Sequence, residues 1–183
     1  METTLIETKT KWTIDTLNSQ IGFKVKYLVF SNVRGNFKEF DATVYTTGED
    51  FTNVEIDFRI NAASIDTGIE KRDTHLKSAD FFDVANYPEL KFTGTSFKKI
   101  DDENYQLKGI LTIKDVSKEV ALDVEFGGIN KDPWGNEKAG FSINGKINRK
   151  DWGLNWNAAL ETGGVLVSEE VKIAAEVQFV KQA

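Results

Sequence analysis

The sequence predicts an all-β protein, an extended antiparallel β-barrel of about eight strands with a short helical insertion. Three observations lead to this prediction. Apolar and polar residues alternate with a period of two along most of the chain, as expected for strands with one buried face. Only one long segment, between Asp66 and Pro88, replaces that period with a helical one. Many antiparallel strands in a chain of 183 residues must also protect their edges, and closure into a barrel removes those edges.

About nine strand-like runs follow one another, separated by short turn signals such as Asp101-Asp102 and Gly127-Gly128. In chain order they cover residues 12–15, 21–27, 33–45, 54–61, 90–97, 105–114, 120–126, 141–147 and 171–179. Together they predict a single domain over residues 11–183, preceded by a flexible N-terminal segment at residues 1–10. A second irregular stretch, residues 151–167, is expected to cover one end of the sheet.

The segment between Asp66 and Pro88 is expected to form one or two short helices. Asp66 or Thr67 is a suitable N-cap for the first helix, and Ser78 for the second. At helical spacing, one face of the segment carries Ile69, Arg72, His75 and Leu76.

The composition argues against several classes of function. A net charge of −6 disfavours nucleic acid as a partner, because phosphate binding requires a basic surface. Without cysteine the chain has no disulfide and no thiol nucleophile, and with the single histidine His75 no metal site is predicted. Residues 1–10 do not resemble a secretory signal, and no run is long enough for a membrane-spanning helix. We therefore expect a cytoplasmic location, or a periplasmic or secreted one if the chain is a processed form.

An eight-stranded barrel is either filled by its own side chains or holds one small ligand. Gly35, Gly94, Gly109 and Gly145 fall on the apolar side of their strands, so each would leave a missing side chain in the lining and favour a cavity. Alternatively, these glycines mark bends and bulges of the barrel. The residues expected to line a cavity are apolar, and they predict a hydrocarbon-rich guest: Phe23, Val25, Phe37, Ile56, Phe58, Phe92, Leu107, Leu111, Phe141 and Ile143.

Several ordered blocks resemble the YceI-like family. They are Trp-Thr-Ile-Asp at 12–15, Arg-Asp-Thr-His-Leu at 72–76, Asp-Phe-Phe-Asp at 80–83, Leu-Lys-Gly-Ile-Leu at 107–111 and Asn-Arg-Lys-Asp-Trp-Gly at 148–153. The resemblance implies a lipocalin-like barrel that binds a polyisoprenoid or related amphiphilic lipid in its lumen, and dimers are known among family members. Asn18 and Lys26 stand where the family carries histidines, and Asp115 stands where a glycine is common.

The head group of such a lipid would lie at the mouth of the barrel. In one interpretation, Arg72 and His75 donate charge-assisted hydrogen bonds to a phosphate or carboxylate. In the other, Arg72 pairs with a carboxylate such as Glu70 or Asp80 to pin the insertion onto the barrel, and His75 caps or packs. Three tryptophans in loops either gate the mouth or plug the barrel end. The candidates for the mouth are thus Arg72, His75, Trp134, Trp152 and Trp156.

Other charged residues are expected to be structural. Arg149 and Asp151 should pair beside the tryptophans. Lysines such as Lys24 and Lys26 fall on the polar side of many strands, which is typical of solubility and edge protection rather than of a binding patch.

These features and the resemblance predict a non-enzymatic protein that binds or carries an isoprenoid or fatty amphiphile, with a polyprenyl compound as one candidate. No cofactor besides that lipid is expected, and the resemblance implies a homodimer. The alternative is a structural or stress-related interaction protein with a packed barrel. A hydrolase centred on His75, with Ser78 nearby, is the third hypothesis, although the chain has no Gly-x-Ser-x-Gly turn.

Overall fold

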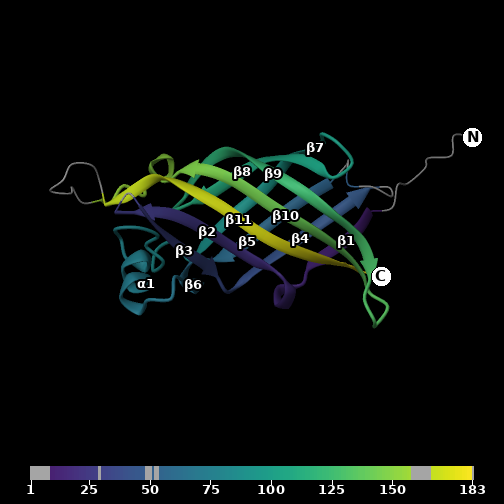
Figure 1. Cartoon of the computed structure of the whole chain (residues 1–183), viewed down its shortest axis with the longest axis horizontal. Coiled ribbons are helices and arrows are strands. Elements are labelled where there is room, and N and C mark those ends of the chain that lie inside the picture. Colours follow the sequence, from purple (N-terminus) through teal and green to yellow (C-terminus); the bar gives the residue numbers. More distant parts are fainter. Residues whose placement is uncertain (1–8, 29, 48–50, 52–53, 158–165, 183) are drawn as a thin grey trace, which may run out of the picture.

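The protein forms a closed antiparallel β-barrel (Figure 1). The computed structural model describes residues 9–28, 30–47, 51, 54–157 and 166–182. The strands are β1 (Lys9–Ile14), β2 (Gln20–Tyr27), β3 (Ser31–Phe37), β4 (Phe40–Thr47), β5 (Val54–Asn61), β6 (Ile65–Asp66), β7 (Glu89–Lys99), β8 (Asn104–Ile113), β9 (Val116–Lys131), β10 (Glu137–Asn148) and β11 (Val167–Lys181). The helical elements are α1 (Glu70–Lys77) and the 3₁₀ turns η1 (Thr16–Asn18), η2 (Ala62–Ser64) and η3 (Arg149–Trp152).

Neighbouring strands follow the order β1-β4-β5-β7-β8-β9-β10-β11, and pairing of β11 with β1 closes the barrel. Three long strands are interrupted. η1 separates β1 from β2, a short break separates β3 from β4, and η2 separates β5 from β6. Counting each interrupted strand once gives eight strands, which confirms the predicted fold class. The predicted domain boundary at residue 11 falls within β1, and residues 1–8 lie outside the described residues.

The helical insertion lies at one end of the barrel, beside β3 and β6 (Figure 1). β5 and β7 pair only as far as Asn61 and Glu89, so the chain leaves the sheet here to form α1 before it returns. The turn between β9 and β10 lies at the opposite end (Figure 1). We call these the α1 end and the β9–β10 end.

A helix was predicted in the correct segment, but its capping residues were predicted wrongly. One α-helix is described in this segment, and Ile69 rather than Asp66 or Thr67 occupies its N-cap position, without a side-chain cap. Ser78 is the C-cap of α1 instead of the start of a second helix. The Asp66 carboxylate accepts a hydrogen bond from the Gly68 N–H at 2.8 Å, so it stabilises the turn before the helix.

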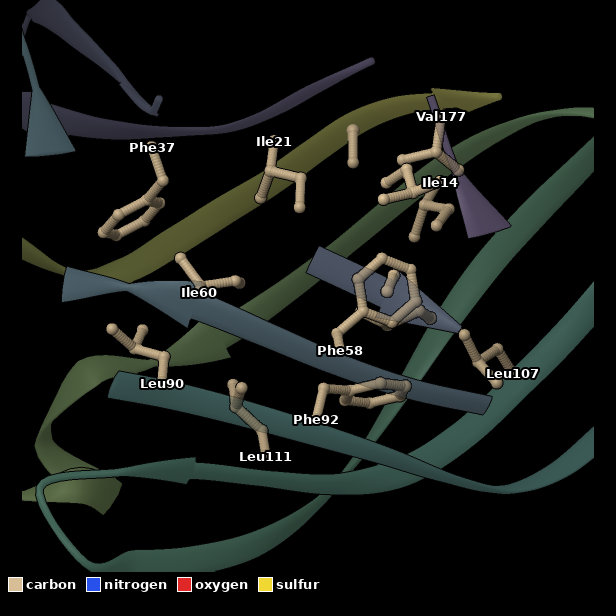
Figure 2. Close-up of a cluster of buried hydrophobic side chains, with 14 of the residues drawn as sticks. Ile14, Ile21, Phe37, Phe58, Ile60, Leu90, Phe92, Leu107, Leu111 and Val177 are labelled. Carbon is tan, nitrogen blue, oxygen red and sulfur yellow. The ribbon is translucent and has the colours of Figure 1, made fainter. Parts of the chain in front are cut away.

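Apolar side chains from facing strands converge on the interior of the barrel, as Phe37, Leu90 and Phe58 do in Figure 2. The interior has two different halves. Towards the β9–β10 end it is packed with aromatic rings, and Phe51 lies 5.3 Å from both Phe126 and Phe141, between ring centroids. Towards the α1 end the same kind of lining surrounds an open space.

Candidate binding cavity

A cavity of about 650 Å³ occupies the α1 half of the barrel. Ligand pockets in proteins typically measure about 300–1,000 Å³. The wall is aliphatic and aromatic, because alternate residues of eight strands point inward there. Its apolar members include Ile21, Phe23, Val25, Val33, Phe37, Phe58, Ile60, Leu90, Phe92, Leu107, Leu111, Ile113, Val120, Leu122, Ile143, Ile147, Val171 and Ile173.

The cavity ends at a floor formed by Phe58, Leu107 and Ile143. These three residues also line a void of only about 30 Å³ on their far side, within the packed half. A void of that size has room for about one water molecule. A guest that enters from the α1 end therefore meets a closed bottom near the middle of the barrel.

The structure settles which predicted residues face this space. Eight of the ten lie on its wall, and the other two, Ile56 and Phe141, lie in the packed half. The Phe141 ring stacks on Phe126 with centroids 5.0 Å apart. Parity placed both residues inside the barrel, but parity carries no information about position along the barrel axis.

The prediction that the four glycines leave gaps in the lining was wrong, although a cavity exists. The alternative, that such glycines mark irregularities of the strands, agrees with the register shift between β7 and β8 that follows Gly94. A side-chain carbon at Gly109 would collide with the Phe92 ring, and one at Gly145 would collide with Leu122. Gly35 and Gly94 are covered in the same way, by the Phe23 ring and by the Ile56 side chain. A neighbouring side chain thus occupies the space above each glycine, so the cavity does not arise from the absence of side chains at these four positions.

At the mouth, Arg72 and Asp73 of α1 are both bonded to Thr67 in the turn before the helix. Arg72 Nε donates to Thr67 Oγ1 and Nη2 donates to Thr67 O, each at 2.7 Å. The Asp73 carboxylate accepts hydrogen bonds from the Thr67 N–H at 2.9 Å and from its hydroxyl at 2.5 Å. The proposed pairing of Arg72 with Glu70 or Asp80 is therefore not formed, and Arg72 lines the cavity.

His75 also lines the cavity, with its ring held from three sides. Its Nε2 lies 2.8 Å from Asp80 Oδ2, and its ring makes edge contacts with Trp156 at 4.6 Å and with Phe81 at 5.2 Å between centroids. The Ser78 hydroxyl donates to the backbone oxygen of His75 at 2.5 Å. Because that hydroxyl bonds to the backbone rather than to the imidazole, the Ser78–His75 pair that the hydrolase hypothesis requires is not formed.

The three candidate tryptophans lie in three different environments. Trp156 lines the cavity. Trp152 is buried and does not line the cavity, and its indole N–H donates to Leu111 O at 2.9 Å, as the plug interpretation requires. Trp134 is 83% exposed in the turn at the β9–β10 end, away from the cavity, and its assignment to the mouth was wrong.

Arg149 lines the cavity, which the sequence did not predict, and its contacts differ from the predicted ones. Its guanidinium is buried and donates to four backbone oxygens, those of Leu154, Trp156, Val167 and Ser168. The expected pair with Asp151 is not formed, and burial lowers the pKa of the guanidinium. No pattern in the sequence indicates this role, because all its partners are backbone groups.

The charged residues around the cavity have one sign. Lys71, Arg72 and Arg149 line it, and no aspartate or glutamate does so among the described residues. A cationic head group would meet like charges there, whereas a neutral or anionic one would not. Within the described ranges, no cluster of histidine and carboxylate residues could hold a metal ion, and no helix has the length and apolarity needed to cross a membrane.

Residues 12–179 match the model of the YceI-like domain family. A UPF0312 protein of Staphylococcus epidermidis is 41% identical over 171 residues, which cover 93% of this chain and 97% of that protein. The YCEI protein of Campylobacter jejuni superposes with a TM-score of 0.73 at 37% identity, over 87% of this chain and 91% of that one. A polyisoprenoid binding domain from Saccharophagus degradans shares the fold, with a TM-score of 0.67 at 15% identity over 93% and 98% of the two chains. The chain therefore belongs to the YceI-like family.

Proposed function

We propose that the protein binds the hydrocarbon chain of a polyisoprenoid or other long amphiphilic lipid and performs no reaction on it. The observation that carries this proposal is the apolar cavity of about 650 Å³, closed at its floor and lined at its other end by residues of α1. The fold shared with the polyisoprenoid binding domain of Saccharophagus degradans supports a guest of this class.

Burial of the chain would supply most of the binding energy. Each buried CH₂ contributes about 0.8 kcal/mol, so a five-carbon isoprene unit contributes on the order of 4 kcal/mol before ordering costs are subtracted. Polar contacts at the exposed mouth contribute less, about 0–1 kcal/mol for an ion pair. The tail would therefore determine affinity, and Arg72 with its cationic neighbours would determine which head group is accepted.

The test is displacement of the uncharged fluorescent probe N-phenyl-1-naphthylamine by isoprenoid alcohols of increasing length. We expect farnesol and geranylgeraniol to displace the probe, with geranylgeraniol binding at least about tenfold more tightly, because it buries one more isoprene unit. The absence of displacement by either alcohol would contradict the proposal.

A matched pair of variants locates the binding. Val25→Trp adds a large side chain to the cavity wall and should abolish displacement, whereas Lys26→Trp adds the same group to the outer face of the same strand and should not. Equal effects of the two substitutions would mean that the probe binds outside the cavity.

A further inference from the structure

Four basic residues form a row across the outer face of the barrel. Arg34 of β3 pairs in register with Lys24 of β2, Lys24 pairs with Lys172 of β11, and Lys172 pairs with Lys146 of β10. We call these four residues the basic row. They line an outer hollow together with small residues such as Gly22 and Ala174.

The basic row is not neutralised within the part of the chain that the structure describes. Lys146 lies 4.0 Å from Glu170, and Asp123 is the one carboxylate residue lining the same hollow. Arg34, Lys24 and Lys172 have no carboxylate within ion-pair distance among the described residues. Like charges directly opposite each other destabilise a sheet. Repulsion within the row therefore lowers the stability of the folded protein unless an anionic partner lies over the row. The row is a local excess of positive charge on a chain whose net charge is −6.

An apolar tip lies next to the row, on the same hairpin. Tyr27, Leu28 and Phe30, at the turn from β2 to β3, are 38%, 36% and 79% exposed. Backbone hydrogen bonds hold this turn in place, from the Leu28 N–H to Leu166 O at 2.9 Å and from the Phe30 N–H to Leu28 O at 2.8 Å. Because Tyr27 and Leu166 line the cavity, the tip forms part of its mouth.

The spacing between tip and row matches the depth of a lipid head-group layer. Lys24 precedes Tyr27 by three residues of extended strand, a distance of about 10 Å. Apolar residues of surface-bound proteins enter a bilayer by about 5–10 Å, to the boundary between head groups and acyl chains. With Phe30 at that boundary, Lys24 and Arg34 would lie at the level of the phosphates.

We infer that the hairpin of β2 and β3, with the basic row behind its tip, docks the mouth of the barrel onto an anionic membrane surface. The choice of a bilayer over another polyanion rests on the proposed lipid cargo and on the exposed apolar tip, which a soluble polyanion would leave in water. Docking in this orientation brings the mouth to the lipid phase, so a chain can pass between bilayer and cavity without crossing water.

The test is sedimentation with vesicles of phosphatidylcholine, with and without phosphatidylglycerol. The protein should bind the vesicles that contain phosphatidylglycerol, and binding should weaken as salt screens the charges. Because each basic residue near an anionic surface contributes about 1 kcal/mol, Lys24→Gln with Lys172→Gln should weaken binding about thirtyfold. Phe30→Ser should weaken it about tenfold.

Two control variants make the same changes elsewhere. Lys98→Gln with Lys108→Gln alters net charge equally on exposed positions of β7 and β8, and Trp134→Ser removes an exposed aromatic at the β9–β10 end. Both should leave vesicle binding unchanged. Equal loss in the control and basic-row variants, equal binding to both kinds of vesicle, or binding to duplex DNA in place of vesicles would overturn the inference.

Geranylgeraniol displacement, measured on the same variants, separates this inference from the proposed function. Displacement without preference for anionic vesicles would refute docking and leave lipid binding in place. Vesicle binding that depends on the basic row, without displacement, would refute lipid binding and leave docking in place.

Discussion

The Phe92 ring occupies the space in which a side chain at Gly109 would lie. Position 109 is the inward-facing residue opposite Gly94 of β7, so the ring can lie over a backbone without side chains of its own. Glycine here allows a close approach. Phe92 also lines the cavity, so the same contact shapes the binding surface.

Gly109→Ala should lower the free energy of unfolding by about 1–3 kcal/mol, because the added methyl group would clash with the Phe92 ring and with the backbone oxygen of Thr93. Urea denaturation measures this change. Gly140→Ala is the matched control, since an added carbon there meets no atom within 4 Å and should leave stability nearly unchanged. A Gly109→Ala protein as stable as the wild type would show that the wall adapts freely.

Asp115 is, after Gly109, a second position where the local backbone determines which residue fits best. With Lys114 it forms the two-residue turn between β8 and β9, and both residues have positive φ, 53° and 61°. This conformation favours glycine or asparagine. The glycine that the resemblance leads us to expect at position 115 is therefore explained by the turn rather than by ligand binding.

Asp115→Gly should raise the free energy of unfolding by about 0.5–1 kcal/mol. Glycine adopts the left-handed conformation without strain, and this gain exceeds the extra chain entropy that glycine loses on folding. Asp102→Gly, in an exposed turn without positive φ, should give no such gain. Thermal unfolding compares the two variants, and equal shifts in both would contradict the assignment.

At the scale of elements, side-chain hydrogen bonds join segments of the barrel that are far apart in sequence. Asp15, just after β1, accepts a hydrogen bond from Lys138 of β10 at 2.6 Å and one from Asn18 at 2.8 Å. Lys138 and the neighbouring bonds lower the pKa of the Asp15 carboxyl. Asn18 stands at a position where the resemblance suggested a histidine, and its amide here supports the turn that joins β1 to β2.

The ion pair between Asp15 and Lys138 should make the free energy of unfolding depend on pH. The pKa of Asp15 is lower in the folded protein than the ordinary value of 3.8, so its contribution is complete above that value and is lost as the pH falls through the folded-state pKa. Asp15→Asn should therefore cost about 1 kcal/mol near neutral pH and progressively less in acid. Chemical denaturation across the pH range measures both proteins, and a difference that grows in acid would contradict the assigned sign.

The sequence was most informative about strands and least informative about depth within the barrel. Alternation predicted the strands and the inward face of residues such as Phe23 and Phe141, because a buried face imposes that period. It could not show that Phe51, between two predicted strands, fills the β9–β10 half, since that depends on contacts with Phe126 and Phe141 across the barrel. The N-cap of α1 was missed for a similar reason, because tertiary contacts rather than capping hold this polar helix.

At the scale of the whole molecule, one barrel combines a packed half with a hollow half. The packed half gives the fold an aromatic core, so the hollow half can remain open without loss of the barrel. The floor at Phe58, Leu107 and Ile143 divides them. The mouth, the cationic residues of α1 and the β2–β3 tip all lie at the hollow end, which is the arrangement that the proposed lipid binding and the proposed membrane docking both require.

The most direct measurement is a crystal structure of the protein grown with geranylgeraniol. We expect continuous density for the isoprenoid chain between Phe23 and Leu111, with the chain ending above Phe58 and the hydroxyl near Arg72. A structure in which the hollow half is closed by its own side chains, or in which the alcohol lies only on the outer surface, would contradict lipid binding in the barrel.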